Sequence, residues 1–306
     1  MIVLSGGTGT PKLIDGLRNV LPEEDITVVV NTAEDLWVSG NLITPDIDTV
    51  LYLLSDRIDK GKWWGVRDDT FSTHDAMKLA GHDEGMMIGD LDRATHIMRS
   101  EMLRQGLSLT EAMQKMASLF GIRSHILPMS DDPVSTMITT PSGRIHFQDF
   151  WVKQHGGPEV LEVSQDGIDD ASISPGVIEA LEKEDNVLIG PSNPITSIGP
   201  IINLPGMRDI LKGKKVVAVS PIIGREPISG PAGKLMSACG FDVSSVGVAE
   251  CYNGLLDAMI LDVRDGSAGD PVMDMGIDVF FTDTLMSSVD ISKDLAKHMI
   301  DIFNNI

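Results

Sequence analysis

The sequence predicts an α/β fold in which a Rossmann-like parallel sheet carries an inserted subdomain of helices and a β-hairpin. Two observations support this prediction. Short β-branched and aliphatic runs, such as residues 26–31 and 215–219, alternate with helical patterns near both ends of the 306-residue chain. Residues from about 56 to 180 lack that alternation. We therefore expect a nucleotide-binding core from residues 1–55 and 181–306, and an inserted subdomain at residues 56–180.

The chain begins with an apolar run at residues 2–4, a glycine-rich turn at residues 5–12 and a helical pattern from Leu13 onward. Strand, glycine turn and helix together present backbone N–H groups to a phosphate. This order predicts a nucleotide or diphosphate site, whose candidate residues are Gly6, Gly7, Thr8, Gly9, Thr10 and Lys12. The turn is neither a Walker A loop nor a complete GxGxxG motif, and a tight turn without a ligand is the alternative.

Acidic residues follow the second predicted strand, residues 26–31. Glu34 and Asp35 lie in the loop after it, and Asp46 and Asp48 lie in the first turn of a helix that opens with proline. Proteins hold Mg²⁺ with one or two carboxylates, together with water and phosphate. We therefore expect Asp46 and Asp48 to be metal ligands or catalytic groups, with capping of the helix N-terminus as the alternative.

The inserted subdomain is expected to combine helices with a hairpin. Residues 91–103 have a helical pattern, and Ser108 and Glu111 form a capping box before a second helix that runs to Phe120. A Pro-Ser-Gly turn inside residues 134–147 separates two strand-like runs and predicts the hairpin.

The α/β alternation then returns, with strands predicted at residues 186–189, 215–219, 241–246 and 279–281 and a closing helix at residues 291–303. Loops at residues 190–197 and 220–233 follow two of these strands. Parallel strands end at one edge of a sheet, so these loops and the first glycine turn should converge on one crevice. Ser192, Asn193 and Ser197 are candidate ligand-binding residues there.

The composition restricts the partners of the protein. A net charge of −21 argues against nucleic acid, which basic surfaces bind. No apolar run approaches the roughly 20 residues of a membrane helix, and the N-terminus has no signal-peptide pattern, so we expect a cytoplasmic protein without a membrane partner. Arg225 and Lys234 are candidate positive charges for a phosphate, with surface solvation as the alternative. Cys239 and Cys251 are interpreted as buried apolar residues.

Several segments resemble one known family. They are SGGTGTPK at residues 5–12, NTAEDLWVSG at 31–40, PDIDTVLY at 45–52, WGVRDDTF at 64–71, IGDLDRATH at 88–96 and GPSNPITSI at 190–198. Together they resemble the 2-phospho-L-lactate transferase family, CofD, which acts in the biosynthesis of the deazaflavin coenzyme F420. The resemblance spans most of the chain and implies an archaeal, cytoplasmic enzyme.

The resemblance implies a Mg²⁺-dependent transfer of a 2-phospho-L-lactyl group. The donor would be lactyl-2-diphospho-5′-guanosine, the acceptor 7,8-didemethyl-8-hydroxy-5-deazariboflavin (Fo), and the products coenzyme F420-0 and GMP. The glycine turn and the Asn193 loop would hold the guanosine diphosphate. Asp46 and Asp48, with Asp35, would hold Mg²⁺ or orient the attacking ribityl hydroxyl, and Asp48 is the favoured base. The inserted subdomain, with Trp64 and Arg93, would help to form the deazaflavin pocket.

Two other functions remain as alternatives. A related family of nucleotide-sugar-binding regulatory proteins has a similar Gly-Gly-Thr-Gly start, but its second motif is Asp-Asp-Gly-Gly-rich, where this chain has Glu-Asp-Leu-Trp at residues 34–37. A nicotinamide-dependent oxidoreductase is disfavoured by the incomplete glycine motif and by Asn31 at the end of the second strand. The acid carried by the donor and the oligomeric state stay open, with a homodimer as one option.

Overall fold

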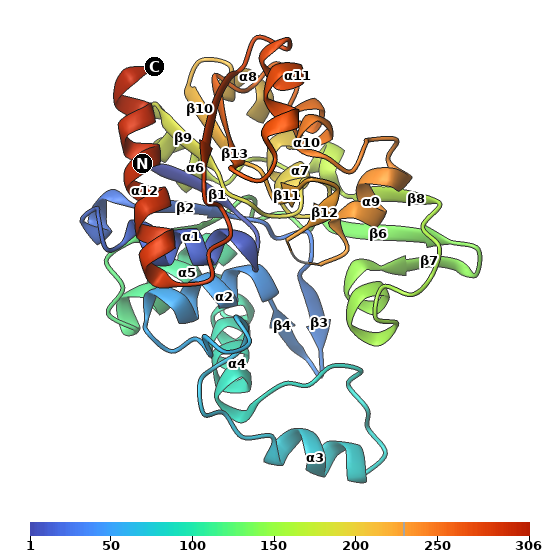
Figure 1. Ribbon diagram of the computed structural model, residues 1–306. Coiled ribbons are helices and arrows are strands. Elements are labelled where there is room, and N and C mark those ends of the chain that lie inside the picture. The colour runs from blue at the N-terminus through green and yellow to red at the C-terminus, as the bar shows by residue number, and fades with distance from the viewer. Residues whose placement is uncertain (229) are drawn as a thin grey trace.

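The computed structural model describes residues 1–228 and 230–306 and is built around a parallel sheet of seven strands (Figure 1). The spatial order of the strands is β14-β13-β10-β9-β1-β2-β5. Their bounds are β1 (Ile2–Ser5), β2 (Thr27–Val30), β5 (His125–Pro128), β9 (Asn186–Ile189), β10 (Lys215–Val219), β13 (Ala258–Asp262) and β14 (Asp278–Thr282). The predicted α/β class and Rossmann-like parallel sheet are confirmed.

The strands are buried because apolar side chains leave both faces of the sheet. In β1, Val3 enters one hydrophobic core, while Ile2 and Leu4 enter the other. This two-sided burial is typical of parallel sheets covered by helices on both faces. The first strand lies in the interior of the sheet, next to the central strand β9, and Ile2 pairs with Thr27 of β2 and with Val187 of β9.

Each face of the sheet has its own set of helices. One core contains side chains from α1 (Gly9–Leu17), α2 (Pro45–Leu54), α5 (Leu109–Leu119) and α12 (Val289–Asn305). The other core contains side chains from α6 (Pro175–Lys183), α7 (Ile198–Asn203), α8 (Met207–Leu211), α9 (Ala232–Ala238), α10 (Ser245–Cys251) and α11 (Gly269–Met273). The predicted closing helix is therefore confirmed, and it packs beside α1.

Residues 56–180 contain most of the elements that belong neither to this sheet nor to the helices that cover it. Helix α3 (Ser72–Leu79) stands away from it at the lower end of Figure 1, and α4 (Asp90–Arg104) connects α3 to the body. Strands β6 (Ser135–Thr140), β7 (Gly143–His146) and β8 (Glu162–Asp166) form an antiparallel sheet in the order β7-β6-β8. The predicted hairpin is its β6–β7 pair, and a π-helix at Asp149–Lys153 follows it.

The remaining short elements lie in loops. They are the hairpin strands β3 (Leu36–Val38) and β4 (Asn41–Ile43), the pair β11 (Ile222–Ile223) and β12 (Glu226–Pro227), and 3₁₀ turns at Glu23–Asp25, Ile168–Asp170 and Gly266–Ala268. No helix within residues 1–228 and 230–306 is both long and apolar enough to cross a bilayer.

Three details differ from the sequence-based expectations. The strand predicted at residues 241–246 is wrong, because the Ser244 hydroxyl accepts a hydrogen bond from Gly247 N (3.1 Å) and starts α10 there. Strand β5 lies within residues 56–180 but pairs with β2 in the main sheet. The domain boundaries at residues 55/56 and 180/181 stay a prediction. Cys239 is exposed rather than buried, because it follows the last residue of α9, and Cys251 is half-buried.

Candidate active site

A cavity of about 1120 Å³ lies where the loops after β1, β9 and β10 meet the first turn of α2. Single small-molecule sites have volumes of roughly 300–1,000 Å³, so this cavity is slightly larger than the upper end of that range. The three loops therefore converge as the parallel sheet predicts. Of the candidate residues, those that line the cavity are Gly7, Thr8, Gly9, Asp46, Asp48, Trp64, Ser192, Asn193 and Ser197.

The glycine turn and the loop after β9 are packed against each other. Gly6 N donates to the Ser192 hydroxyl (3.1 Å), which also shares a hydrogen bond with the Thr10 hydroxyl (2.7 Å). A Cβ atom at Gly9 would collide with the Pro191 carbonyl oxygen, which is backbone and has no rotamer to change. Gly6 and Thr10 are therefore joined to the neighbouring loop behind the cavity wall.

Asp46 lines the cavity in an environment that opposes its ionisation. Burial is the main cause and raises the pKa of Asp46 to about 7, although Asn31 Nδ2 donates to its carboxylate (2.9 Å) and partly counters burial. Glu34 is a second buried carboxyl in the lining. Its pKa is raised well above the usual range by burial and by the charge of Asp46, and its amide partner is Gln148 Nε2 (3.2 Å).

Asp48 has the opposite surroundings. Arg99 reaches both carboxylate oxygens through Nη1 (2.5 Å) and Nη2 (3.1 Å), and His96 Nε2 lies 3.1 Å from Oδ2. Burial opposes the charge of Asp48, but Arg99 and then His96 overcome it and hold the pKa well below the usual range. Asp48 Oδ2 also accepts from Thr44 N (3.2 Å), which fixes the start of α2.

His96 joins the carboxylates of Asp48 and Asp92. Its Nε2 atom lies 3.1 Å from each of them, and Asp92 also accepts from the Tyr52 hydroxyl (2.6 Å). Burial lowers the pKa of His96, but its hydrogen bonds to the two carboxylates outweigh burial and raise the pKa to about 9. His96 is therefore a buried imidazolium at neutral pH.

Metal ions have two candidate positions in this cavity. Asp48, Asp92 and His96 offer ligand atoms within 4.8 Å of one another, which is close enough to surround one ion. In this arrangement, however, Arg99 and the His96 imidazolium already supply positive charge. Asp46 and Glu34 form the second candidate position. Their hydrogen-bond partners are uncharged amides, so the negative charge of these two carboxyls is not balanced by a neighbouring cation. The oxygen chemistry of that pair fits a hard divalent cation better.

Asn193 provides a hydrogen-bond donor that the fold leaves unused. Its Oδ1 atom accepts from Ile195 N (3.0 Å), whereas its buried Nδ2 has no partner among the described residues. Buried donors without a partner are rare and mark a place where a ligand or water binds. Asn193 also lines the cavity, so its amide is a candidate donor for a ligand or water there.

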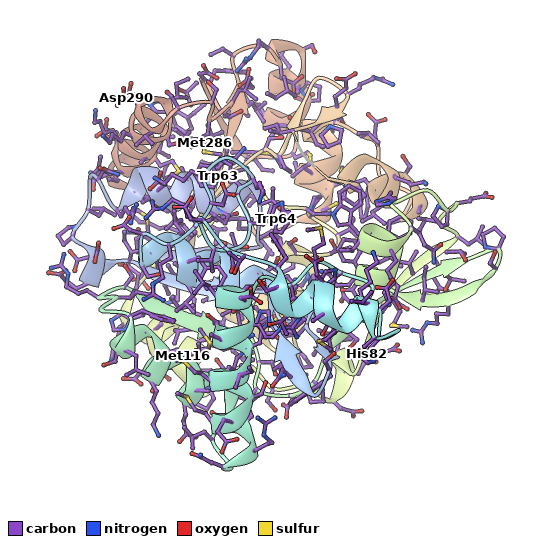
Figure 2. The ribbon with its side chains drawn as sticks, turned by 90° about the horizontal axis from the view of Figure 1, so that it is seen from below. Trp63, Trp64, His82, Met116, Met286 and Asp290 are labelled. Atoms are coloured by element: carbon purple, nitrogen blue, oxygen red, sulfur yellow. The ribbon has the colours of Figure 1, made fainter. Side chains whose placement is uncertain are left out.

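An apolar portion of the wall comes from elements far from the glycine turn. Met86, Met87 and Ile88 lie between α3 and α4, and Trp64 and Trp151 add aromatic rings. Trp63, the neighbour of Trp64, has another role (both are labelled in Figure 2). The Lys12 ammonium lies 5.5 Å from the centroid of the Trp63 ring. Burial lowers the pKa of Lys12, which does not line the cavity.

Two more candidate residues lie outside the lining. Arg93 forms a bidentate ion pair with Glu84 (3.0 and 2.6 Å), so it supports the wall from behind. The Asp35 carboxyl is shielded from solvent, and burial raises its pKa well above the usual range. The sequence interpretation placed Glu34 in the acidic cluster without selecting it as a site residue, and it missed His96 and Arg99. The spacing 92, 96, 99 places polar side chains on one face of α4 and is the signal that was available.

Comparison with known proteins agrees with this geometry. The family model described as 2-phospho-L-lactate transferase CofD matches residues 1–275. A 2-phospho-L-lactate transferase of Methanococcoides burtonii is 67% identical over 306 residues, covering 100% of both chains. That of Methanocaldococcus jannaschii is 44% identical over 308 residues, covering 99% of this chain and 98% of its own.

One solved structure shows the same fold at low sequence identity. The crystal structure of a UPF0052 family member from Bacillus halodurans is 15% identical and matches with a TM-score of 0.69, covering 98% of this chain and 97% of its own.

Proposed function

This chain belongs to the CofD family of 2-phospho-L-lactate transferases, and on that premise we propose that it transfers the 2-phospho-L-lactyl group from lactyl-2-diphospho-5′-guanosine to Fo. The products are coenzyme F420-0 and GMP. The observation that carries this proposal is the single cavity in which the glycine turn, a pair of buried carboxyls and an aromatic wall meet. Its volume accommodates a nucleotide donor and a planar acceptor together.

The donor is assigned to the end of the cavity formed by the glycine turn and the loop after β9. The N-terminus of α1 presents backbone N–H groups and a positive dipole end to a diphosphate. The unused Asn193 amide and the hydroxyls of Ser192 and Ser197 add hydrogen-bonding groups. Gly7, Thr8 and Gly9 are the residues of the turn that border this space.

The acceptor is assigned to the apolar wall. Trp64 and Trp151 offer flat rings for a deazaflavin, and Met86 to Ile88 complete an apolar surface. Arg93 contributes by holding Glu84 in the segment before α4. A hydroxyl held at this side would attack the phosphorus in line, a reaction that depends on positioning and charge neutralisation more than on covalent catalysis.

Mg²⁺ is the cofactor that the family implies, and Asp46 with Glu34 would hold it. Their buried oxygens are the ligand type that Mg²⁺ prefers, and their hydrogen-bond partners, the amides of Asn31 and Gln148, carry no compensating charge. When bound, the ion would offset charge on the diphosphate and on departing GMP.

Asp48 is better suited to positioning than to proton transfer. Its carboxylate is engaged by Arg99 and His96, and its low pKa makes it a weak base. It fixes Thr44 and the first turn of α2, which carries Asp46. We therefore propose that Asp46 is the carboxyl that acts at the reacting groups, while Asp48 holds it in place.

A product assay tests the proposal. The purified protein is mixed with Fo and lactyl-2-diphospho-5′-guanosine, with Mg²⁺ or with EDTA, and products are followed by liquid chromatography and mass spectrometry. We expect Mg²⁺-dependent formation of F420-0 with an equal amount of GMP. If no product forms but the Tm of the protein rises saturably as a nucleotide sugar is added, a regulatory binding protein would be favoured. Cytoplasmic location and a homodimer remain parts of the proposal.

A further inference from the structure

Three consecutive backbone carbonyls converge on one ammonium group beside the cavity. Lys234 Nζ, from α9, donates to the carbonyl oxygens of Gly156 (2.7 Å), Gly157 (3.0 Å) and Pro158 (2.6 Å). An ammonium group has three donors, so this turn uses all of them. Lys234, which the sequence suggested as a phosphate-binding charge, is thus committed to the protein backbone.

The turn that Lys234 holds supports the aromatic wall. It follows the π-helix Asp149–Lys153, and His155, directly before it, has a φ of +51°, a left-handed conformation that is unfavourable for a non-glycine residue. A Cβ atom at Gly156 would lie 3.0 Å from Cζ3 of Trp151, so the turn lies directly against that ring. Trp151 and His155 both line the cavity.

The charge on Lys234 is what allows the three carbonyls to point at one place. Their oxygen atoms carry partial negative charges that repel one another unless a cation lies between them. The ammonium is a compact charge with rotatable donors, whereas a guanidinium is a planar fork that cannot place three donors at one nitrogen. Lys234 also lies 5.7 Å from the centroid of the Phe150 ring, so the same charge contacts the π-helix.

We propose that Lys234 is a positioning residue that acts as a fixed monovalent cation for the 156–158 turn and thereby holds the Trp151 side of the acceptor pocket. This inference rests on the proposed function, because it assigns Trp151 to the acceptor. The lysine side chain is exposed, so removing it lets water reach the freed carbonyls and leaves the fold intact. The effect is therefore confined to the turn and to the wall that it supports.

The test uses the full chain with Lys234 replaced by alanine or methionine. For Lys234→Ala we expect KM for Fo to rise about tenfold and KM for the guanosine donor to change less than about twofold. Ammonium or methylammonium ions should restore KM for Fo, because a small cation fits the space that the alanine leaves. Lys234→Met should show the loss without the rescue, since its side chain fills that space. Lys183→Ala, which removes an exposed ion pair with Glu179, is the matched control.

Hydrogen exchange of residues 149–158 separates this inference from the proposed function. Faster exchange in Lys234→Ala, slowed again by ammonium, supports the inference even if the wild type forms no F420-0, which would contradict the proposed function alone. Unchanged exchange together with an unchanged KM for Fo overturns the inference. An impairment that neither cation relieves also overturns it, because it would show that the aliphatic chain of Lys234, and not its charge, holds the turn.

Discussion

Asp46 and Asp48 lie two residues apart in one helical turn, yet their surroundings push their pKa values in opposite directions. Burial raises the pKa of Asp46 to about 7, whereas Arg99 and His96 overcome burial at Asp48 and lower its pKa. Pairs of carboxyls that the environment separates in this way are a common source of divided roles in an active site. In the proposed function, this division assigns Asp46 to the reactants and Asp48 to the scaffold.

Mg²⁺ binding should therefore depend on pH through Asp46. A proton and the cation compete for the same oxygens, so affinity for Mg²⁺ should fall as the pH drops below about 7. Asp46→Asn should weaken Mg²⁺ binding by about tenfold or more and flatten this pH dependence. Calorimetric titration of Mg²⁺ into the protein with GDP measures both effects. Asp209→Asn, which breaks an exposed pair with Lys212, is the control, and equal affinity in the two variants would remove Asp46 from the metal site.

His96 should make the folded state more stable at neutral pH than in alkali. Its pKa is raised from about 6.5 to about 9 on folding, so its contribution is complete below about pH 6.5 and is lost as the pH rises through about 9. That contribution is at most about 3 kcal/mol. Thermal unfolding of wild type and His96→Gln should show a Tm difference that is largest near pH 6 and shrinks by pH ~9.5.

The exposed residue His125 provides the control for this titration. His125→Gln should change Tm little, because this side chain is exposed. A Tm difference for His96→Gln that is independent of pH would show that folding does not raise the pKa of His96.

At the scale of elements, α3 and α4 cap each other. The Asp90 carboxylate, at the start of α4, accepts from Ser72 N and Thr73 N of α3 (both 3.0 Å). In return, the Asp69 carboxylate, just before α3, accepts from Leu91 N (2.8 Å) at the start of α4. Both helices thereby satisfy N–H groups that a helix start leaves open.

The segment between α3 and α4 has one further anchor. Glu84 accepts from Arg93 and from the Ser39 hydroxyl (2.6 Å) at the β3–β4 turn. The same segment supplies Met86, Met87 and Ile88 to the cavity wall. The wall on the acceptor side therefore depends on a small number of polar contacts rather than on the main hydrophobic cores.

Arg93→Met should loosen that wall and leave the donor end unchanged. We expect KM for Fo to rise about tenfold and the Kd of GDP to stay within about twofold. Hydrogen exchange of residues 80–88 should become faster, since Glu84 loses its bidentate partner. Arg144→Met, which breaks an exposed pair with Asp166, serves as the matched variant. A weaker GDP affinity with normal use of Fo would instead assign Arg93 to the donor.

Elements with strong local patterns could be predicted from the sequence. The aliphatic runs of β1, β2, β9 and β10 and the capping box at Ser108 need no distant partner to be recognised. The prediction for residues 241–246 was wrong because their apolar side chains suggested a strand, whereas Ser244 caps the N-terminus of α10, which begins at Ser245. Nothing local identifies β5 as a strand of the main sheet, since its pairing with β2 joins residues about 100 positions apart.

The site could be predicted only in part for the same reason. Glycine turns and strand-end loops can be recognised from the local sequence, and they line the cavity as expected. The charge state of Asp48, by contrast, is decided by Arg99, which is 51 residues away in sequence. Lys12 was expected at the phosphate and Arg93 in the deazaflavin pocket, but contacts with Trp63 and Glu84 engage them instead.

At the scale of the whole molecule, a net charge of −21 opposes the approach of an anionic donor. The backbone N–H groups at the N-terminus of α1 attract an anion only at short range. The same holds for Lys78 and Lys153, which line the cavity. Salt shortens the reach of the overall field to about 8 Å at 0.15 M ionic strength. The field should therefore slow donor capture mainly at low salt.

Raising the ionic strength to about 0.15 M at constant free Mg²⁺ should increase kcat/KM for the guanosine donor by about two- to fivefold. The value for Fo should change less. Steady-state rates across a KCl series measure both. A fall in kcat/KM for the donor would show that the cavity lysines, and not the net charge, govern capture.

The order of the strands also constrains when the protein can fold during translation. Strand β1 lies between β2 and β9, and Ile2 pairs with Val187. Helix α1 packs on α12 through Gly16 and the backbone of Ser292. The βα unit of β1 and α1 must therefore wait for a strand about 180 residues downstream and for a helix about 280 residues downstream. The glycine turn has both of these neighbours only after the chain has been made as far as α12.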